Sequence, residues 1–214
     1  MISPLFIFFF RYYVNLLFYR RFRRVWLDQH YYPGTGHATL YFLNHNSWWD
    51  GLVPLLLNEF RFHQQAKAVM DSRQLEKHPF FKKIGAYPID RTRSRKAVAA
   101  LLYTAELLKQ KGTSVFIYPQ GVISDPSMPL RFEKGIGLLH ERCEGVDFVP
   151  IALHQHTLFS DKPDLFIKTG NPVRIEQHLT RNNKTLALED TLNELLVRLR
   201  MESCREDLNY ERLV

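Results

Sequence analysis

Short apolar segments alternate with helical patterns along most of the chain. Segments rich in β-branched and aromatic residues predict buried strands at 38–43, 65–70, 114–118 and 146–154, with further strands expected within 80–91 and 164–173. Apolar residues recur at helical spacing from Leu52, from Ser72 to about Lys77, over 97–111, from Phe132, and over 186–208. Strands that alternate with helices in this way predict one α/β domain with a central, mostly parallel sheet flanked by helices.

The N-terminal segment differs from the rest in its density of aromatic side chains. Its apolar stretch, residues 4–26, is interrupted by Arg11 and Asn15, and falls short of the roughly 20 uninterrupted apolar residues of a membrane-spanning helix. An arginine collar at positions 20, 21, 23 and 24 is typical of a helix lying in the interface of an anionic membrane. The alternative is a helix packed on the domain's own core. We therefore divide the chain into a membrane-anchoring helix at 1–30 and one domain at 31–214.

Composition narrows the class of partner and the compartment. The net charge of +7 favours an anionic partner, such as nucleic acid, anionic lipid or a phosphorylated ligand. The arginines adjoin an apolar helix and no nucleic-acid-binding motif, so we do not expect nucleic acid as the partner. Neither of the two cysteines, Cys143 and Cys204, has metal-binding spacing. A reducing compartment is the simplest interpretation, and we expect a membrane-associated protein on the cytoplasmic face.

The polar segment after the strand at 38–43 carries the strongest candidate chemistry. His45 and Asp50 lie where this strand gives way to a helix, and ligands of α/β sheets bind at the carboxyl ends of strands. Asp50 could fix the tautomer of His45 and stabilise its cation, which a general base requires. The alternative is that Asp50 caps a helix and that His45 is an ordinary loop histidine.

Other polar features allow fewer conclusions. The charged loop at 90–96 could bind a phosphate or simply face solvent. His154 and His156 have no accompanying Cys or Glu pair, so we expect no metal site. Pro150 interrupts the strand at 146–154, and proline in a strand predicts an edge, a bulge or a strand end.

Four motifs occur in one order along the chain: Asn44-His45-x4-Asp50, Gly85-x4-Asp90-Arg91, Tyr118-Pro119-Gln120-Gly121 and Val149-Pro150-Ile151-Ala152. Over roughly residues 35–175 the chain thereby resembles the glycerolipid acyltransferases typified by 1-acyl-sn-glycerol-3-phosphate acyltransferases. The resemblance implies an α/β domain on a membrane surface that moves a fatty acyl group to a lipid hydroxyl. The donor would be acyl-CoA or acyl carrier protein, used as a co-substrate, and no cofactor is implied.

The resemblance also assigns roles to individual residues. His45 would take the proton of the acceptor hydroxyl, Asp50 would orient His45, and Arg91 would help bind a phosphorylated acceptor. The other positions implied to bind substrate are Asn44, Pro119, Gln120, Gly121 and Pro150. From their apolar character, Trp48, Trp49 and residues 52–57 would line an acyl channel or pack in the core.

Two positions in the third motif depart from the family pattern. Gln120 stands where the family usually has Glu, and Val122-Ile123 stand where it has Thr-Arg. The missing arginine is the one expected to contact an acceptor phosphate. We therefore expect a less charged acceptor, such as a glycolipid, a sugar hydroxyl or another lipid alcohol.

Three alternatives remain open. Lysophosphatidic acid is the acceptor if Arg91, Arg93 and Lys82 hold its phosphate. The loss of the family's Glu at Gln120 motivates a catalytically inactive lipid-binding protein on the same fold. The same base could also activate water, as in a thioesterase.

Overall fold

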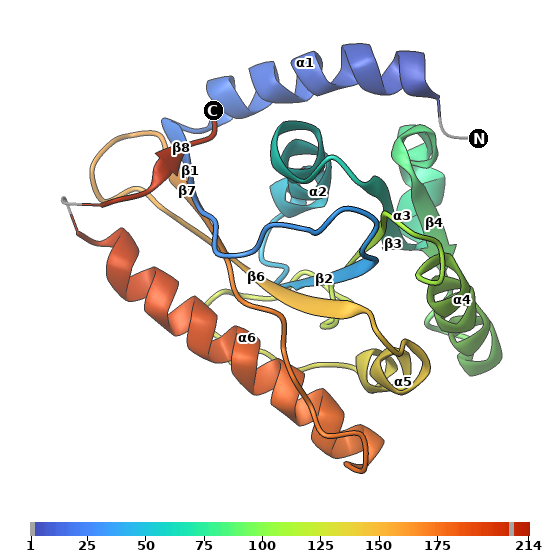
Figure 1. The fold of residues 1–214 in the computed structure, drawn as a ribbon. Helices are drawn as coiled ribbons and strands as arrows, with labels where there is room; N and C mark the ends of the chain where they lie inside the picture. Colours follow the sequence, from blue (N-terminus) through green and yellow to red (C-terminus); the bar gives the residue numbers. More distant parts are fainter. Residues whose placement is uncertain (1–2, 206–207) are drawn as a thin grey trace.

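The computed structural model describes residues 3–205 and 208–214, and the described residues form one sheet with helices on both faces (Figure 1). Its eight strands lie in the order β4-β3-β5-β2-β6-β7-β1-β8. The pairs β6–β7 and β1–β8 are antiparallel and the other five pairs are parallel, which confirms the predicted mostly parallel α/β sheet. The strands are β1 (Arg24–Asp28), β2 (Thr39–Leu43), β3 (Gln65–Asp71), β4 (Ala86–Ile89), β5 (Thr113–Ile117), β6 (Asp147–His156), β7 (Asp164–Thr169) and β8 (Glu211–Arg212).

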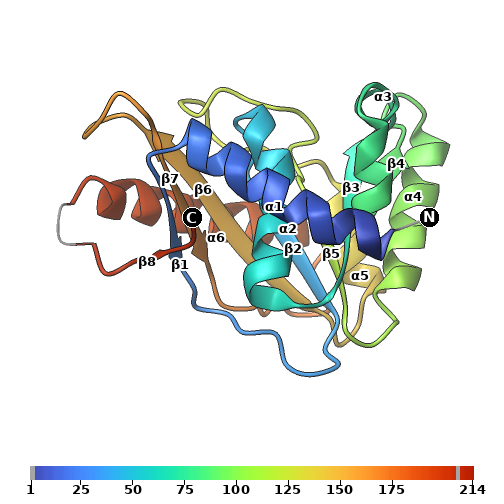
Figure 2. The ribbon, with the colours of Figure 1, turned by 90° about the horizontal axis from the view of Figure 1, so that it is seen from above.

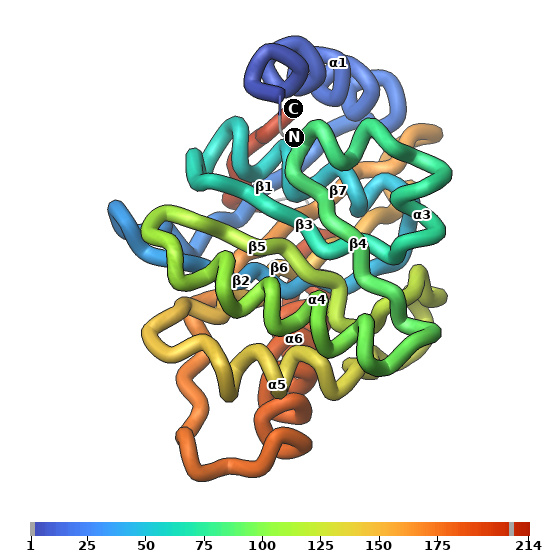
Figure 3. The backbone as a smooth tube through the Cα atoms, turned by 90° about the vertical axis from the view of Figure 1, so that its right-hand side faces the viewer, coloured from blue at the N-terminus to red at the C-terminus, as the bar shows by residue number. Residues whose placement is uncertain are grey.

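Helices form two layers around this sheet, as the side view in Figure 3 shows. The α-helices are α1 (Pro4–Arg21), α2 (Val53–Leu57), α3 (Ser72–Lys77), α4 (Ser94–Leu107), α5 (Gly135–Arg142) and α6 (Arg181–Ser203). Short turns of other helical types are η1 (Trp48–Leu52), η2 (Asn58–Phe62) and η3 (Pro79–Ile84). Helices α1 and α2 cover one face, and α4, α5 and α6 cover the other.

Alternation along the central strand divides the core into two halves. In β2, Tyr41 and Leu43 belong to the cluster beneath α1 and α2, while Leu40 and Phe42 belong to the cluster above α4, α5 and α6. Successive side chains of a strand point to opposite faces, so a strand buried on both faces is apolar throughout. This explains the continuous apolar run that predicts β2.

Three predicted elements differ from the structure. Residues 24–28, which the sequence analysis assigned to the N-terminal anchor, form β1 of the central sheet, because Val25 and Leu27 alternate with more exposed neighbours. The N-terminal half of the strand expected within 80–91 is the 3-10 turn η3, which ends at Gly85 with φ 102°. The C-terminal helix α6 runs from Arg181 to Ser203 and does not reach residue 208.

Pro150 lies inside an interior strand, so the expected edge, bulge or strand end is wrong for β6 as a whole. The carbonyl of Pro150 accepts a hydrogen bond from the backbone N–H of Gly170, at 2.8 Å. In a strand, the N and C=O of one residue point the same way, so the nitrogen of Pro150 also faces β7. The β6–β7 ladder begins one residue later, at Ile151, so the missing N–H of Pro150 falls at the end of that ladder.

The close approach of Gly85 to the neighbouring strand β3 can be tested by substitution. A Cβ at Gly85 would lie 2.7 Å from the carbonyl oxygen of Ala66, whereas a Cβ at Gly112, which also has a positive φ, would meet nothing within 4 Å. Gly112→Ala should lower the free energy of unfolding by about 1 kcal/mol through backbone strain alone. Gly85→Ala should lower it by about 2–4 kcal/mol, because a clash with backbone is added. Urea unfolding measures both, and equal losses would contradict this account.

Candidate active site

Two loops meet at one edge of the sheet, where the parallel strands β2 and β5 both end. Phe42 is in register with Ile117, so the residues that follow, 44–50 and 118–121, leave the sheet side by side. Figure 2 shows these connections and the long loop over 121–131 along the same edge. The carboxyl ends of parallel strands are where α/β folds bind ligands.

The carboxylate of Asp50 organises the first loop. Its Oδ2 accepts the backbone N–H groups of Asn46 and Ser47, each at 2.7 Å, and its Oδ1 accepts the Ser47 hydroxyl at 2.7 Å. The same Oδ2 lies 3.2 Å from Nδ1 of His45. Asp50 therefore both caps the helical turn η1 and contacts His45. The two expected roles, helix cap and partner of the histidine, are compatible.

This geometry sets what His45 can do. We assign the proton to Nδ1, because a carboxylate oxygen faces that nitrogen and can only accept. Nε2 is then the unprotonated nitrogen, available to take a proton from a bound hydroxyl, and the nearby carboxylate stabilises the resulting cation.

Tyr118 holds the pair from the neighbouring strand, and the sequence analysis missed it as a site residue. Its ring stacks on that of His45, with centroids 4.3 Å apart, and its hydroxyl donates to the backbone carbonyl of Asp50 at 2.5 Å. Burial and the nearby Asp50 charge raise the pKa of Tyr118 well above its ordinary value, so the phenol stays a neutral donor. The sequence signal for a role of Tyr118 was its place directly before Pro119 in the third motif. Tyr118 was instead interpreted as the last residue of an apolar strand.

Gln120 joins the second loop to the first through both ends of its amide. Its Oε1 accepts the backbone N–H of His45 at 2.8 Å, and its Nε2 donates to the hydroxyl of Ser124. Ser124 in turn donates its own N–H to the carbonyl of His45, and its carbonyl accepts from the side chain of Asn46, both at 2.9 Å. Gln120 and Ser124 thus fasten the loop over 121–131 to the histidine.

Three residues predicted to bind substrate lie within the protein's own packing. Asn44 is fully buried, and its side chain bonds both backbone groups of Leu153, so it ties β2 to β6. Pro119 is buried and its carbonyl accepts the N–H of Glu133. Pro150 is buried on the α6 side of the sheet against Gly170. A positioning role fits these three residues better than direct contact with a substrate.

Arg91 reaches the same edge from the end of β4. A Cβ at Gly121 would come within 2.5 Å of its Nη1, so the positive φ of Gly121 and its missing side chain let the guanidinium approach the loop. Nε of Arg91 lies 3.7 Å from Oδ2 of Asp71 and makes no hydrogen bond, although it is buried. Arg91 is thus a partly satisfied cation beside the third motif.

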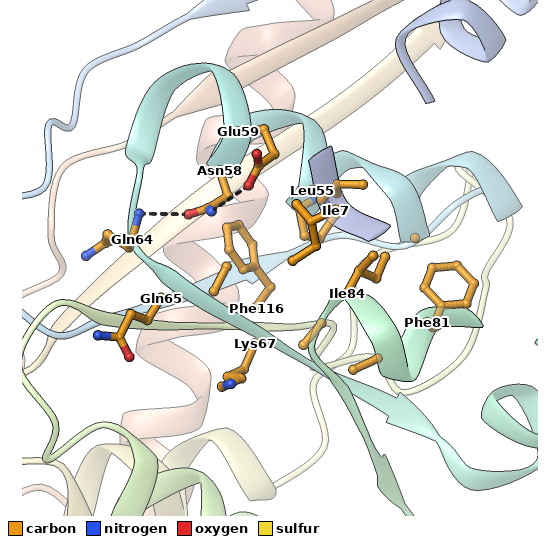
Figure 4. Close-up of a pocket in the computed structure, with 15 residues that line it drawn as sticks. Ile7, Leu55, Asn58, Glu59, Gln64, Gln65, Lys67, Phe81, Ile84 and Phe116 are labelled. Carbon is orange, nitrogen blue, oxygen red and sulfur yellow. Dashed lines mark hydrogen bonds between the residues drawn. The ribbon is translucent and has the colours of Figure 1, made fainter. Parts of the chain in front are cut away.

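A cavity of about 300 Å³ extends from Gly51, next to Asp50, beneath α1 (Figure 4). Ile7, Leu55, Ile84 and Phe116 provide apolar walls. Glu59 and Lys67 stand at its border, and burial lowers the pKa of Lys67.

Of the residues expected to line an acyl channel or pack in the core, some border this cavity and others do not. Pro54 and Leu55 line this cavity. Trp49 instead packs edge-on against Phe18 and Phe22, next to α1, while Trp48 is 44% exposed.

The two histidines of β6, His154 and His156, lie next to each other, with ring centroids 5.6 Å apart. Burial, together with the positive charges of His156 and Arg200, lowers the pKa of His154 to about 4, so it is neutral at physiological pH. Within residues 3–205 and 208–214, no three His, Cys, Asp or Glu side chains are grouped so that they could hold a metal ion.

Comparison with known proteins gives consistent findings. The chain is 28% identical over 127 residues to acl-2 of Caenorhabditis elegans, named provisionally as a 1-acyl-sn-glycerol-3-phosphate acyltransferase. This match covers 57% of the chain but only 44% of the nematode protein, so the chain spans less than half of that relative's length. The crystal structure of PlsC, the 1-acyl-sn-glycerophosphate (LPA) acyltransferase of Thermotoga maritima, has the same fold, with a TM-score of 0.64 over 93% of this chain and 81% of PlsC. At 17% identity, this similarity concerns the fold alone.

A family profile described as Acyltransferase matches residues 24–154, which is more than half of the chain. The matched segment begins with β1 and includes His45, Asp50, Arg91 and Gln120. The chain belongs to the acyltransferase family.

Proposed function

We propose that this protein is a membrane-associated O-acyltransferase that moves a fatty acyl group from an acyl thioester to the hydroxyl of a lipid or glycolipid. The observation that carries the proposal is the contact between Asp50 and Nδ1 of His45, at a strand end and beside an apolar cavity. A base with a fixed tautomer is what deprotonation of a hydroxyl requires. The cavity beside Gly51 is suited to the acyl chain, because its walls are mostly apolar.

The proposed reaction is a direct transfer. The acceptor hydroxyl gives its proton to Nε2 of His45 while its oxygen attacks the thioester carbonyl. The bond from carbonyl carbon to sulfur then breaks, and the leaving thiolate takes the proton from the imidazolium. Asp50 stabilises the imidazolium between these two steps.

The acceptor we propose is uncharged. Val122 and Ile123 stand in the loop fastened to His45 and are 51% and 53% exposed, so apolar side chains occupy the positions next to the third motif. The cation at this edge, Arg91, already lies near Asp71. The names of the relatives and the presence of Arg91 favour the alternative acceptor, 1-acylglycerol-3-phosphate.

Membrane association is supported by the outer surface of α1. Leu5, Phe9 and Tyr19 are 70%, 64% and 63% exposed, and Phe8, Tyr12, Tyr13 and Leu16 are also exposed. Arg20 and Arg21 follow in the last turn, so apolar and cationic groups face outward together. An anionic membrane surface, which we place at its cytoplasmic face, is the partner that fits both groups. Of the helices described, none is long and apolar enough to span a bilayer.

The first test removes the proposed base and its partner. His45→Ala should abolish acyl transfer from acyl-CoA or acyl carrier protein, and Asp50→Asn should lower kcat by roughly 10²–10⁴, because the tautomer and the cation lose their support. His178→Ala, at an exposed histidine, is the matched control. Lipid binding without transfer in the unmodified protein would instead indicate a binding protein, and thioester cleavage with water alone a thioesterase.

The second test concerns the Gln120 amide. Gln120→Leu should lower kcat at least tenfold, since the His45 N–H and Ser124 both lose a partner. A buried donor left without a partner costs about 1–3 kcal/mol. Gln120→Glu should keep most of the activity, because a carboxylate accepts from the His45 N–H and from the Ser124 hydroxyl. Steady-state kinetics compare the variants, and a fully active Gln120→Leu protein would refute the positioning role.

The third test addresses the acceptor. With membrane-bound protein, a neutral glycolipid or lipid alcohol should be acylated faster than lysophosphatidic acid. Ile123→Arg should raise kcat/KM for lysophosphatidic acid about tenfold, since one charge-assisted contact to phosphate is added. Met128→Arg, at an exposed position of the same loop, is the matched control. A wild-type preference for lysophosphatidic acid would overturn the neutral acceptor.

A further inference from the structure

The loop between β6 and β7 exposes two large apolar side chains. Leu158 is 62% exposed and Phe159 is 42% exposed, just after β6 ends at His156. Strand β6 is parallel to β2, and the last residue of β2 is in register with Ile151. At roughly 3.3 Å per residue, β6 therefore continues about 16 Å past the end of β2. The two apolar side chains thus project from the same edge of the sheet that carries His45.

The loop over 121–131 lies along the same edge, as Figure 2 shows, and is fastened at two points. The backbone N–H of Ser124 donates to the carbonyl of His45 at 2.9 Å. The carbonyl of Pro126 accepts a hydrogen bond from Arg200 of α6 at 2.5 Å. Several apolar side chains of this loop and of the neighbouring turn η1 are nevertheless exposed, namely Val122, Ile123, Met128 and Trp48. Packing within the chain therefore does not account for them.

The loop between β6 and β7 is attached directly to the end of α1. Arg23, which follows this helix, donates its backbone N–H to the carbonyl of Pro163 at 2.9 Å, and its side chain bonds to the carboxylate of Asp164. Its guanidinium also reaches the carbonyl of Phe159, at 3.5 Å. Tyr19 is exposed at the same end of α1. The exposed apolar face of α1 and the apolar loop are therefore joined at one border of the molecule.

Arginines lie where these two apolar surfaces meet. Arg20 and Arg21 are exposed in the last turn of α1, and Arg24 is exposed at the start of β1, which pairs with the start of β7. Apolar and aromatic groups flanked by arginines suit the headgroup level of an anionic membrane. The loops themselves carry the carboxylates of Asp125 and Asp161. Their contact with a membrane therefore depends on apolar side chains, and the preference for anionic lipid depends on the arginines.

We propose that this edge of the sheet is a membrane-contact surface, where Leu158, Phe159 and the loop over 121–131 enter the headgroup region of an anionic phospholipid membrane together with α1. The inference rests on the proposed transfer to a lipid and specifies how the acceptor arrives. Because His45 lies at the same edge, its site faces the membrane, and a lipid hydroxyl reaches Nε2 without leaving the bilayer. A membrane that touched α1 alone would leave the apolar loops in water.

Vesicle flotation with the full chain tests this surface without requiring turnover. Leu158→Gln should weaken binding to vesicles of phosphatidylcholine and phosphatidylglycerol about tenfold, since an apolar side chain no longer leaves water on binding. Leu102→Gln is the matched control and should leave binding unchanged, because Leu102 is 42% exposed on α4, which covers the face of the sheet opposite α1. Both leucines are exposed, so neither substitution should prevent folding.

Fluorescence shows whether the loop itself meets the lipid. Leu158→Trp adds a tryptophan at the loop tip, and the emission that it adds to that of the unmodified protein should be quenched by vesicles of brominated phospholipid. The emission added by Leu102→Trp should not be quenched. Quenching that is equal in the two variants would contradict the proposed surface.

Each outcome decides the assignment. Vesicle binding that is unchanged in Leu158→Gln, or weakened equally in Leu102→Gln, would overturn it. A change of oligomeric state in lipid-free Leu158→Gln, with vesicle binding intact, would assign the loop to a second copy of the chain instead. If Leu158→Gln loses vesicle binding but the unmodified protein shows no His45-dependent transfer, the membrane surface stands and the proposed function falls. If transfer depends on His45 while Leu158→Gln binds vesicles normally, the surface falls and the proposed function stands.

Discussion

A buried carboxylate determines the form of the loop that carries His45. Asp50 is 4% exposed, and an ionised carboxyl group is unfavourable there unless hydrogen-bond donors surround it. The backbone N–H groups of Asn46 and Ser47 meet that requirement only if the chain turns sharply after β2. That turn brings His45 back toward the same carboxylate. The pair that we propose as catalytic is therefore a consequence of how one charge is accommodated, and not of two side chains meeting by chance.

The rest of the fold supports this turn from two sides. Tyr118 bonds the carbonyl of Asp50 from the β5 side, and Gln120 bonds the N–H of His45. On the opposite side, Trp49 of η1 packs against Phe18 of α1. The helix that we place on the membrane thus contacts the turn that carries Asp50 directly. Helix α1 and the loop that carries His45 are therefore connected by side-chain packing rather than by a flexible linker.

Local features of this architecture could be predicted from the sequence, and long-range ones could not. The His45–Asp50 pair lies within one loop, so its spacing makes the contact one of two interpretations that the sequence allows. Tyr118 bonds a backbone carbonyl 68 positions away, and no periodicity encodes that bond. The strand β1 was mistaken for part of the anchor because arginines flank a pattern only five residues long. Pro150 is tolerated in an interior strand because its neighbour β7 ends there, which only the assembled sheet reveals.

The most direct test of this account is the tautomer of the neutral His45 ring, measured by nitrogen-15 NMR on the full chain. We predict that the neutral form of the imidazole carries its proton on Nδ1, hydrogen-bonded to Asp50, and leaves Nε2 free. Asp50→Asn should abolish this preference, because an amide can donate as well as accept a hydrogen bond and therefore does not select the Nδ1-protonated ring. A neutral ring protonated on Nε2 in the unmodified protein would contradict the assignment of His45 as the base.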